Sequence, residues 1–247
     1  MSIKKLVVLG GVSYLFCLLV LTPASWWLKL APLPADVRLG QVHGTLWQGR
    51  IQALSYQSLE LRQLQWQLSP WRLLTGTLAV QLQAGELSEM EQAYVNGQLR
   101  YGFSGLQLQD TLVRYPVRDI APLLRLPLPV GADGTLMLDI DVYQQGAPWC
   151  KTLQGQASWQ QARLQPPTGW IDLQHIFASL ACDEGELVLI TDGQNPLGLD
   201  VTARLQAAGR FSVDGTLKPD ASMPEEVHQA MQFVGAPNAE GRFRIRF

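Results

Sequence analysis

Alternation of apolar and polar residues dominates the chain from residue 37 onward, and it predicts half-buried β-strands. In "GTLMLDIDVY" the apolar side chains of the expected inner face occupy every second position from Leu136 to Val142. The stretches "GTLAVQLQ" and "GRFRIRF" alternate in the same way. Successive side chains of a strand point to opposite faces, so each stretch predicts one apolar and one polar face. The chain is therefore expected to be mainly β, with an antiparallel β-rich domain.

A glycine, a small or polar residue and an apolar residue recur together where the predicted strands begin. The glycines of this pattern are Gly44, Gly76, Gly97, Gly134 and Gly215. Glycine at such a position allows a tight turn or a bend into the next strand. The irregular spacing excludes a strict solenoid and favours repeated hairpins. The first example, "HGTLWQG", is expected to be the first glycine-started strand, with Trp47 packing against the sheet.

The alternation changes phase within "LELRQLQWQL". Leu59 and Leu61 hold odd positions, whereas Leu64 and the apolar residues after it hold even positions. A slip of one residue would turn half of these side chains to solvent, so we expect a β-bulge near Arg62 and Gln63.

Two or three short helices are expected among the strands. Residues 120–124 predict one or two turns, ended by the prolines of "LPLPVG". The apolar residues of "DLQHIFASLAC" have the spacing of an amphipathic helix over residues 173–180. Residues 224–235 begin with a proline and two glutamates and end at a glycine, which predicts a third helix.

An uncharged apolar segment, Leu6 to Thr22, follows Lys4 and Lys5. It reaches the shorter end of the range for a membrane-spanning helix, and the tryptophans that follow extend it into the interface. The basic residues before it predict a cytoplasmic N-terminus. The expected organisation is a cytoplasmic N-terminus at 1–5, a transmembrane anchor at 6–27, a proline-rich linker at 28–36 and a periplasmic β-rich domain at 37–247.

Two alternatives stay open for this segment. A cleaved signal peptide has a weak small-residue site at Thr22-Pro23-Ala24, although the proline and the bulky "SWWLKL" after it disfavour cleavage. A buried core helix is the other alternative, and it would rarely lie uncharged at an extreme N-terminus.

Composition narrows the class of partner. Charged residues make up 16% of the chain, against roughly 25% in an average soluble protein, and the net charge is -2. This balance lacks the basic surface that binds nucleic acid, so no nucleic-acid partner is expected.

The cysteine positions agree with export. Cys17 lies within the apolar segment, which leaves Cys150 and Cys182 in the body of the chain. Cysteines that share an oxidising compartment often pair, so we expect a disulfide between these two. Two separately buried thiols are the alternative.

The sequence contains no recognisable catalytic or metal-binding pattern. The 3 histidines, His43, His175 and His228, lack a metal-binding spacing. His175 follows Asp172 by three residues, but a histidine beside a carboxylate is far commoner than a catalytic dyad.

Other reactive motifs are missing as well. Gly49 is followed by Arg50 and Ile51, where a phosphate-binding loop needs a lysine and a hydroxyl. No serine lies in a G-x-S-x-G turn. The acidic residues of 183–192 do not have the spacing of a calcium loop. We therefore expect no catalytic residue, metal or cofactor, and a protein that binds instead of turning over a substrate.

Four stretches in order resemble the protein N family of the bacterial type II secretion system, over essentially the whole chain. They are "VHGTLWQGR", "LQWQLSPWRLLTGTLAVQL", "IAPLLRLPLPVGADGTLMLDI" and "PEEVHQAMQFVGAPNAEGRFRIRF". The residues that carry the match are Trp47, Trp66, Pro70, Trp71 and Gly76, together with Gly44 and Gly49. These motifs are interpreted as structural.

The resemblance implies an inner-membrane component of the machine that moves folded exoproteins across the outer membrane, in contact with other subunits of that machine. The family is similar in pattern to the periplasmic domains of AsmA-type envelope proteins, so an AsmA-like lipid-handling or envelope-maintenance module is an alternative. Under that alternative the apolar face contacts lipid, unless large side chains such as Trp66 and Trp159 fill it. A remote alternative is an outer-membrane β-barrel, because "FRIRF" imitates the terminal strand of such proteins.

The C-terminal strand is the candidate edge for a partner. Arg242, Arg244 and Arg246 alternate with apolar residues. Charges on an edge strand discourage random pairing and offer contacts to a chosen acidic partner. The alternative is that this strand is a well-paired end of the sheet whose arginines are solvated.

Overall fold

A computed structural model describes residues 20–30, 34, 36–57, 59–123, 131–165, 169–231 and 234–246, with isolated positions between 7 and 18. The strands are β1 (Val37–Leu39), β2 (Val42–Gly44), β3 (Gln48–Tyr56), β4 (Leu59–Leu68), β5 (Leu78–Ala84), β6 (Tyr94–Gly102), β7 (Gly105–Pro116), β8 (Gly131–Gln145), β9 (Cys150–Gln165), β10 (Ile171–Asp183), β11 (Glu186–Thr191), β12 (Asp200–Leu205), β13 (Phe211–Leu217) and β14 (Phe243–Arg246). The helices are α2 (Ala24–Leu30), α3 (Pro70–Leu73), α4 (Val117–Ile120) and α5 (Glu225–Ala230), with 3-10 turns η1 (Ala121–Leu123) and η2 (Ala207–Gly209).

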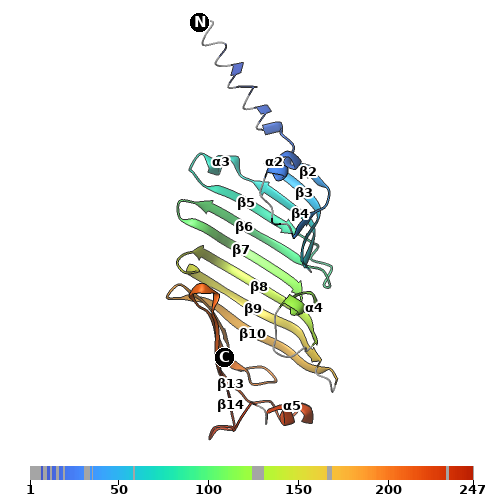
Figure 1. The fold of residues 1–247 in the computed structure, drawn as a ribbon, viewed down its shortest axis with the longest axis vertical. Coiled ribbons are helices and arrows are strands. Elements are labelled where there is room, and N and C mark those ends of the chain that lie inside the picture. The colour runs from blue at the N-terminus through green and yellow to red at the C-terminus, as the bar shows by residue number, and fades with distance from the viewer. Residues whose placement is uncertain are drawn as a thin grey trace.

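The strands form one 14-stranded sheet in which neighbours in the sequence are neighbours in space. Every pairing is antiparallel, and only β2 leaves the path, by pairing beside β1 along β3. In Figure 1 the strands cross the long axis of the molecule, with α2 and α3 near one end and β13, β14 and α5 at the other. The prediction of a mainly β, antiparallel domain with few short helices is confirmed.

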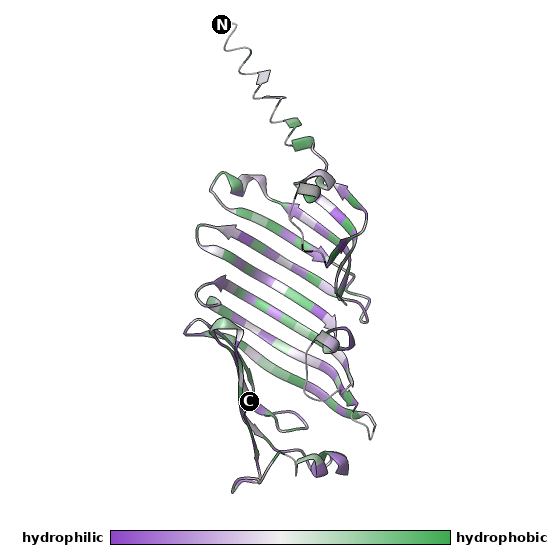
Figure 2. Cartoon of the chain, in the orientation of Figure 1, coloured by the Kyte–Doolittle hydropathy of each residue, from purple (hydrophilic) through white to green (hydrophobic). Residues whose placement is uncertain are grey.

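One face of this sheet is apolar. Apolar and polar residues alternate along the strands (Figure 2), and the register aligns the apolar ones across neighbours. One row runs through Leu68, Val80, Leu99, Leu108, Tyr143 and Leu153. Its continuation on the later strands is Cys182, Leu187, Leu205 and Phe211. Most of these side chains are only half-buried, so the face is incompletely covered.

The apolar row depends on local irregularities that the alternation alone does not reveal. Val142 was expected beside Ile140 on the apolar face, but the register with β9 shifts between these two residues. Val142 pairs with Gln109, and Tyr143 takes the place in the apolar row. A bulge moves every later side chain of its strand to the opposite face.

The phase change in β4 occurs at the predicted place. Arg62 and Gln63 are both exposed, and Gln63 has a φ of 53°, in the left-handed region. The register with β3 does not shift, because Leu61 faces Leu54 and Leu64 faces Ile51. The phase change is therefore no bulge against β3. On the other side of β4, the backbone N–H of Gly85 donates to the carbonyl oxygen of Arg62 at 2.8 Å, one residue out of step with the pairing of Gln65 and Gln83, so the predicted irregularity lies against β5. The left-handed conformation of Gln63 reverses the side-chain alternation of β4, and the alternation of β3 reverses opposite it, between Ile51 and Leu54.

The helix predicted over residues 173–180 is wrong, because this segment lies within β10. Gln174 has a φ of 57°, and the register with β9 shifts on both sides of it. This bulge places Leu173 and Ile176 in one apolar cluster although they are three residues apart. The helical spacing in the sequence thus comes from a bulged strand, which pairs with both β9 and β11.

The other two helix predictions are confirmed in outline. The turn expected at 120–124 corresponds to α4 and η1, and residues 124–130 lie outside the described part. Helix α5 begins after Pro224, which is its N-cap and not its first helical residue. It ends at Ala230, before the predicted stop at Gly235.

A compact core forms where α5 covers the sheet. It contains Ala162, Leu173, Met223 and Val227, all buried. Trp159, Leu164, Ile171, Ile176 and Leu197 pack around it. Two layers are needed to remove a sheet face from water, and the segment 223–227 supplies the second layer here.

The glycine pattern does not mark strand starts. Gly97, Gly134 and Gly215 lie inside β6, β8 and β13, and Gly44 ends β2. Of the five, Gly76 alone lies just before a strand, two residues ahead of the first residue of β5. A Cβ at Gly215 would lie 2.3 Å from the carbonyl oxygen of Asp200. Glycine is used there for close approach of the neighbouring strand.

The stretch "HGTLWQG" is likewise a hairpin and not a strand. Gly44 ends β2 with a φ of 100°, and it pairs with Gly49 at the start of β3. Trp47 lies in the connection between them and is half-buried. The pattern was misinterpreted because glycines that flank a tight turn resemble glycines that start strands.

The expected anchor at 6–27 lies largely outside the described residues. Among the residues that are described, no helix has both the length and the apolar character needed to cross a membrane.

Candidate functional site

The histidines lie on separate elements, with His43 in β2, His175 in β10 and His228 in α5. Asp172 accepts a hydrogen bond from the backbone N–H of Gln174 at 2.8 Å. The ring of His175 neighbours Phe177, with 6.3 Å between the ring centroids. Within the described part of the chain, no group of three His, Cys, Asp or Glu residues is placed to hold a metal ion.

Carboxylates of the acidic stretch at 183–192 bind other groups of the protein. Nη1 of Arg204 lies 2.8 Å from Oδ2 of Asp183 and 3.9 Å from Oε2 of Glu186. Asp192 accepts a hydrogen bond from the backbone N–H of Gln194 at 2.9 Å. These carboxylates are partnered by an arginine and by backbone.

A polar hollow of about 680 Å³ lies where β8, β9 and β10 approach α4. Two ion pairs line it: Arg163 binds Asp133, and Arg118 lies 3.5 Å from Glu91. The backbone N–H of Gly134, and then Arg163, hold the pKa of Asp133 below its usual value. Asp133 is therefore ionised at neutral pH, and the hollow presents no carboxylic acid at that position.

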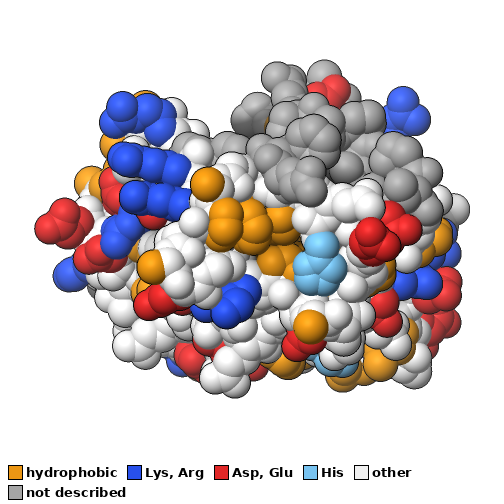
Figure 3. Space-filling model, turned by 90° about the horizontal axis from the view of Figure 1, so that it is seen from below, with side chains coloured by type: hydrophobic (Ala, Val, Ile, Leu, Met, Phe, Trp, Pro, Cys, Tyr) orange, Lys and Arg blue, Asp and Glu red, His pale blue; other side chains and the backbone are white. Residues whose placement is uncertain are grey.

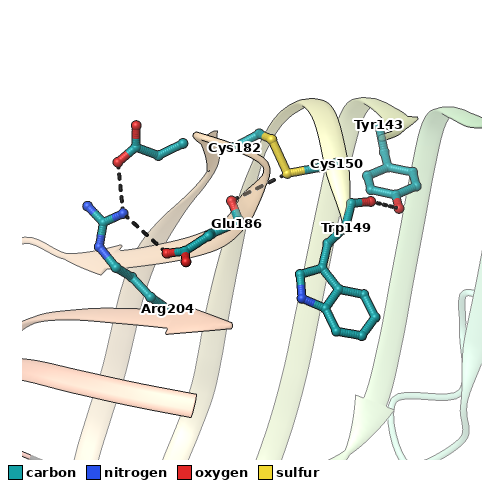
Figure 4. The surroundings of a disulfide bond; sticks show 7 residues. Tyr143, Trp149, Cys150, Cys182, Glu186 and Arg204 are labelled. Carbon is teal, nitrogen blue, oxygen red and sulfur yellow. Dashed lines mark hydrogen bonds and ion pairs between the residues drawn. A yellow bond between two sulfur atoms is a disulfide. The ribbon is translucent and has the colours of Figure 1, made fainter. Parts of the chain in front are cut away.

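The predicted disulfide between Cys150 and Cys182 is present and joins the start of β9 to the end of β10 (Figure 4). The Cα atoms are 6.1 Å apart. The backbone N–H groups of Trp149 and Cys150 both donate to the carbonyl oxygen of Gly185, at 3.1 and 3.2 Å. The Trp149 indole donates to the carbonyl oxygen of Gln206 at 2.8 Å. Together these contacts tie three connections at one margin of the sheet.

The candidate partner edge does lie at the margin of the sheet, where β14 is the last strand. In the described part of the chain, no strand pairs with its outer side. Arg244 and Arg246 lie 3.2 and 3.8 Å from Asp214, with side chains 68% and 76% exposed. Arg242 is the least exposed of the three and donates to the Thr216 hydroxyl at 2.8 Å. The structure thus separates two exposed arginines, which share one carboxylate, from one that is held by the fold.

The opposite face of β14 continues the apolar surface. Phe243 pairs with Leu217 and Ile245 with Gly215. Seen from this end of the molecule, hydrophobic side chains gather at the centre and basic side chains group to one side (Figure 3). The edge therefore has an apolar face and a basic face.

Arg114 was not noticed in the sequence, and it organises the loop between β5 and β6. Its guanidinium donates to the carbonyl oxygens of Glu86, Leu87 and Glu89 at 2.8 to 3.0 Å, and it lies over the Tyr94 ring. The side chain is buried. The available signal was a lone arginine within the apolar run "TLVRYPV".

The residues that carried the family resemblance divide into packed and exposed groups. Trp66 donates to the carbonyl oxygen of Leu46 at 3.1 Å, and a Cβ at Gly49 would lie 2.3 Å from its ring. This group is structural, as interpreted. Trp71 of α3 is instead exposed, and Pro70 begins the helix on which it lies.

Comparison with known proteins identifies the same family that these residues indicated. The model of the family described as type II secretion system (T2SS), protein N, matches residues 35–246. A type II secretion system protein N of Aeromonas hydrophila is 35% identical over 242 residues, covering 96% of this chain and 94% of its own. The protein of that name from Vibrio cholerae serotype O1 is 29% identical over 241 residues, covering 94% and 95%. No solved structure matches the chain significantly.

The match extends over nearly all of the sheet, from β1 to the last described residue of β14. It therefore includes the packed tryptophans, the disulfide pair and the basic edge in a single family domain. The chain belongs to the type II secretion system protein N family.

Proposed function

We propose that this chain is a non-enzymatic inner-membrane component of a type II secretion system that supports export of folded exoproteins across the outer membrane. The observation that carries the proposal is the match to protein N over nearly the whole chain. In this proposal the apolar N-terminal segment anchors the chain, and the sheet lies in the periplasm. Other subunits of the secretion system are its partners.

The geometry of β14 supports a scaffold that binds through an edge. Its outer side is unpaired among the described strands, and a partner strand that continues the ladder would gain main-chain hydrogen bonds. Acidic side chains on that partner would meet Arg244 and Arg246, which share Asp214. Two copies joined through β14 would instead bring these arginines together, so the charge favours a different partner.

Deletion of the gene tests the proposal. The expected result is that exoproteins still cross the inner membrane and fold, but remain at least partly in the periplasm. A resident periplasmic protein should be unaffected, and the wild-type gene should restore secretion. Normal secretion in the deletion strain contradicts the proposal.

Charge reversal at Arg244 and Arg246 tests the edge separately. Replacement of both by glutamate should reproduce the secretion defect without lowering the abundance of the protein. Arg210→Glu, on the exposed turn between β12 and β13, is the matched control. Arg242 is left unchanged because it holds Thr216. Normal secretion by the double variant would show that these arginines are merely solvated and do not contact a partner.

A second candidate function is AsmA-like lipid handling, and the half-buried apolar row favours it. The indole N–H groups of Trp66 and Trp159 are fixed to backbone oxygens, at 3.1 and 3.0 Å. Neither Leu99 nor Leu108, in the middle of the row, is fully buried. This function predicts normal secretion but altered outer-membrane lipid asymmetry in the deletion strain.

A further inference from the structure

Large apolar side chains are exposed at the end of the sheet that carries α3. Trp71 and Leu74 are 78% and 79% exposed, and Phe103 is 100% exposed. Trp71 lies in α3, Leu74 caps that helix, and Phe103 lies in the turn between β6 and β7. A Cβ built on Gly76 would lie 2.9 Å from the Phe103 ring, which places the two turns side by side. These three side chains are called the apolar tip.

The apolar tip lies close to the point where the N-terminal segment joins the sheet. Pro23 forms a β-bridge with Thr45, and Ala24 at the start of α2 is buried. In the same hairpin, the carbonyl oxygen of Trp47 accepts a hydrogen bond from the backbone N–H of Leu68 at 2.6 Å. Helix α3 begins two residues after Leu68, and Figure 1 shows α2 and α3 at the same end of the sheet.

The two chain segments that form the apolar tip carry charge of one sign. Residues 61–85 and 92–109 contain no aspartate or glutamate, and they include Arg72 and Arg100 near the two turns. Basic residues beside exposed aromatic and aliphatic ones favour the headgroup region of an anionic bilayer. A tryptophan suits that region because it combines a large apolar ring with an N–H donor.

The backbone of the α3 turn is already hydrogen-bonded within the chain. The N–H groups of Leu74, Thr75 and Gly76 donate to carbonyl oxygens of α3 at 3.0 to 3.3 Å. The Thr75 hydroxyl donates to the carbonyl oxygen of Arg72 at 2.8 Å. A turn whose polar groups are satisfied internally loses little when water is withdrawn from it.

We propose that the apolar tip inserts into the surface of the anionic phospholipid bilayer that holds the N-terminal segment. This inference rests on the proposed membrane anchoring. The tip is a second point of contact, so it fixes the orientation of the sheet relative to the membrane. With one point of attachment the sheet would swing about the anchor, whereas two points hold the basic edge at β14 away from the bilayer.

A fluorescent label at position 103 tests the insertion in the full-length chain. The environment-sensitive label is attached to a Phe103→Cys variant that also carries Cys17→Ser, and the protein is reconstituted into vesicles of phosphatidylethanolamine and phosphatidylglycerol. The expected result is a blue shift of the emission and its loss when the lipids carry a quencher. Phe177→Cys is the matched control, because Phe177 is an exposed phenylalanine of β10. Its label should stay in water.

Two further measurements keep the outcome clear. Trp71→Ser with Leu74→Ser should abolish the quenching at position 103 while the melting temperature is unchanged, because both side chains are exposed. Flotation of the same vesicles reports the anchoring. Protein that does not float overturns both the anchoring and the insertion. If the protein floats but the label at position 103 emits and is quenched no differently from the label at position 177, the insertion alone is overturned. If the label is shielded from water only in membranes that contain the secretion apparatus, a protein covers the apolar tip and the insertion is overturned as well.

Discussion

At the C-terminal end of the sheet, residues of α5 and the loop before it cover Leu173, and a disulfide ties β9 to β10. At the N-terminal end, no residue of α3 is buried, and Trp71 and Leu74 lie in solvent. The strands between these ends follow the same antiparallel order throughout. The ends therefore differ in what is laid on the sheet and not in the sheet itself.

This difference suggests that the C-terminal end contributes more to the stability of the fold, whereas the N-terminal end offers a surface for binding. A single sheet cannot bury both of its faces, so a buried core forms only where a second layer is present. The C-terminal end has that layer and a covalent link between its strands. The N-terminal end has exposed apolar side chains that become useful only when something outside the chain covers them. The variants below should affect the two ends unequally.

Removal of the disulfide should have the largest effect on the C-terminal end. The cysteines are 32 residues apart, so chain-entropy arguments give a loss of roughly 3 to 4 kcal/mol in the free energy of unfolding. Urea unfolding of the Cys150→Ser, Cys182→Ser double variant measures it. Cys17→Ser should leave the unfolding midpoint unchanged. Equal midpoints for all proteins would show that the hydrogen bonds around Gly185 suffice to hold this end.

Leu173→Ala should be nearly as costly, because Leu173 is among the most deeply buried large side chains. The cavity and the lost apolar contacts together predict a loss of about 3 kcal/mol. Phe177→Ala, on the same strand but exposed, should cost far less. Thermal unfolding compares the two variants. Similar losses would mean that the cover over Leu173 contributes little to stability.

Arg114→Met should weaken the N-terminal half by about 2 kcal/mol, since a buried charged donor and its hydrogen bonds to three carbonyl oxygens are lost. The loop between β5 and β6 should also become sensitive to protease. Arg100→Met is the control, because Arg100 donates to the side chain of Gln98 on its own strand, at 3.2 Å. If the loop of the Arg114 variant resists protease as well as wild type does, other contacts hold it.

Asp133→Asn should have the smallest effect, which is present at neutral pH and disappears in acid. The folded state holds the pKa of Asp133 below its usual value, so its stabilising contribution is present above the unfolded pKa. That contribution is lost as pH falls through the folded pKa, below about pH 4. The pair with Arg163 is partly exposed, so less than about 1 kcal/mol is expected. Unfolding at pH 3 and pH 7 should show a shallower pH dependence in the variant.

Much of the fold follows from local patterns, while the exceptions share one physical cause. Alternation predicted the strands around Leu82, Leu138 and Ile245 because side-chain direction along a strand is a local property. It did not predict that residues 173–180 are a strand, since the bulge at Gln174 gives its apolar residues a helix-like spacing. A bulge shows itself only when the partner strand is in place.

The candidate sites divide in the same way. The disulfide and the basic strand followed from residue type and from the expected compartment, but the roles of the three arginines did not. Arg242 is held by Thr216, from β13, and this contact depends on the register of two strands. Arg114 and the apolar tip were missed because their meaning depends on neighbours that are distant in the sequence.

The sequence by itself determined that the chain alternates into antiparallel strands, that it carries few charges, and that two cysteines are available to pair. Those properties depend on side-chain chemistry and on spacing over a few residues. Only the tertiary structure decided that Leu173 lies in a core whereas Trp71 lies on the surface. Whether a side chain is buried depends on what packs over it. Leu173 of β10 is covered by Val227 of α5, a residue distant in the sequence.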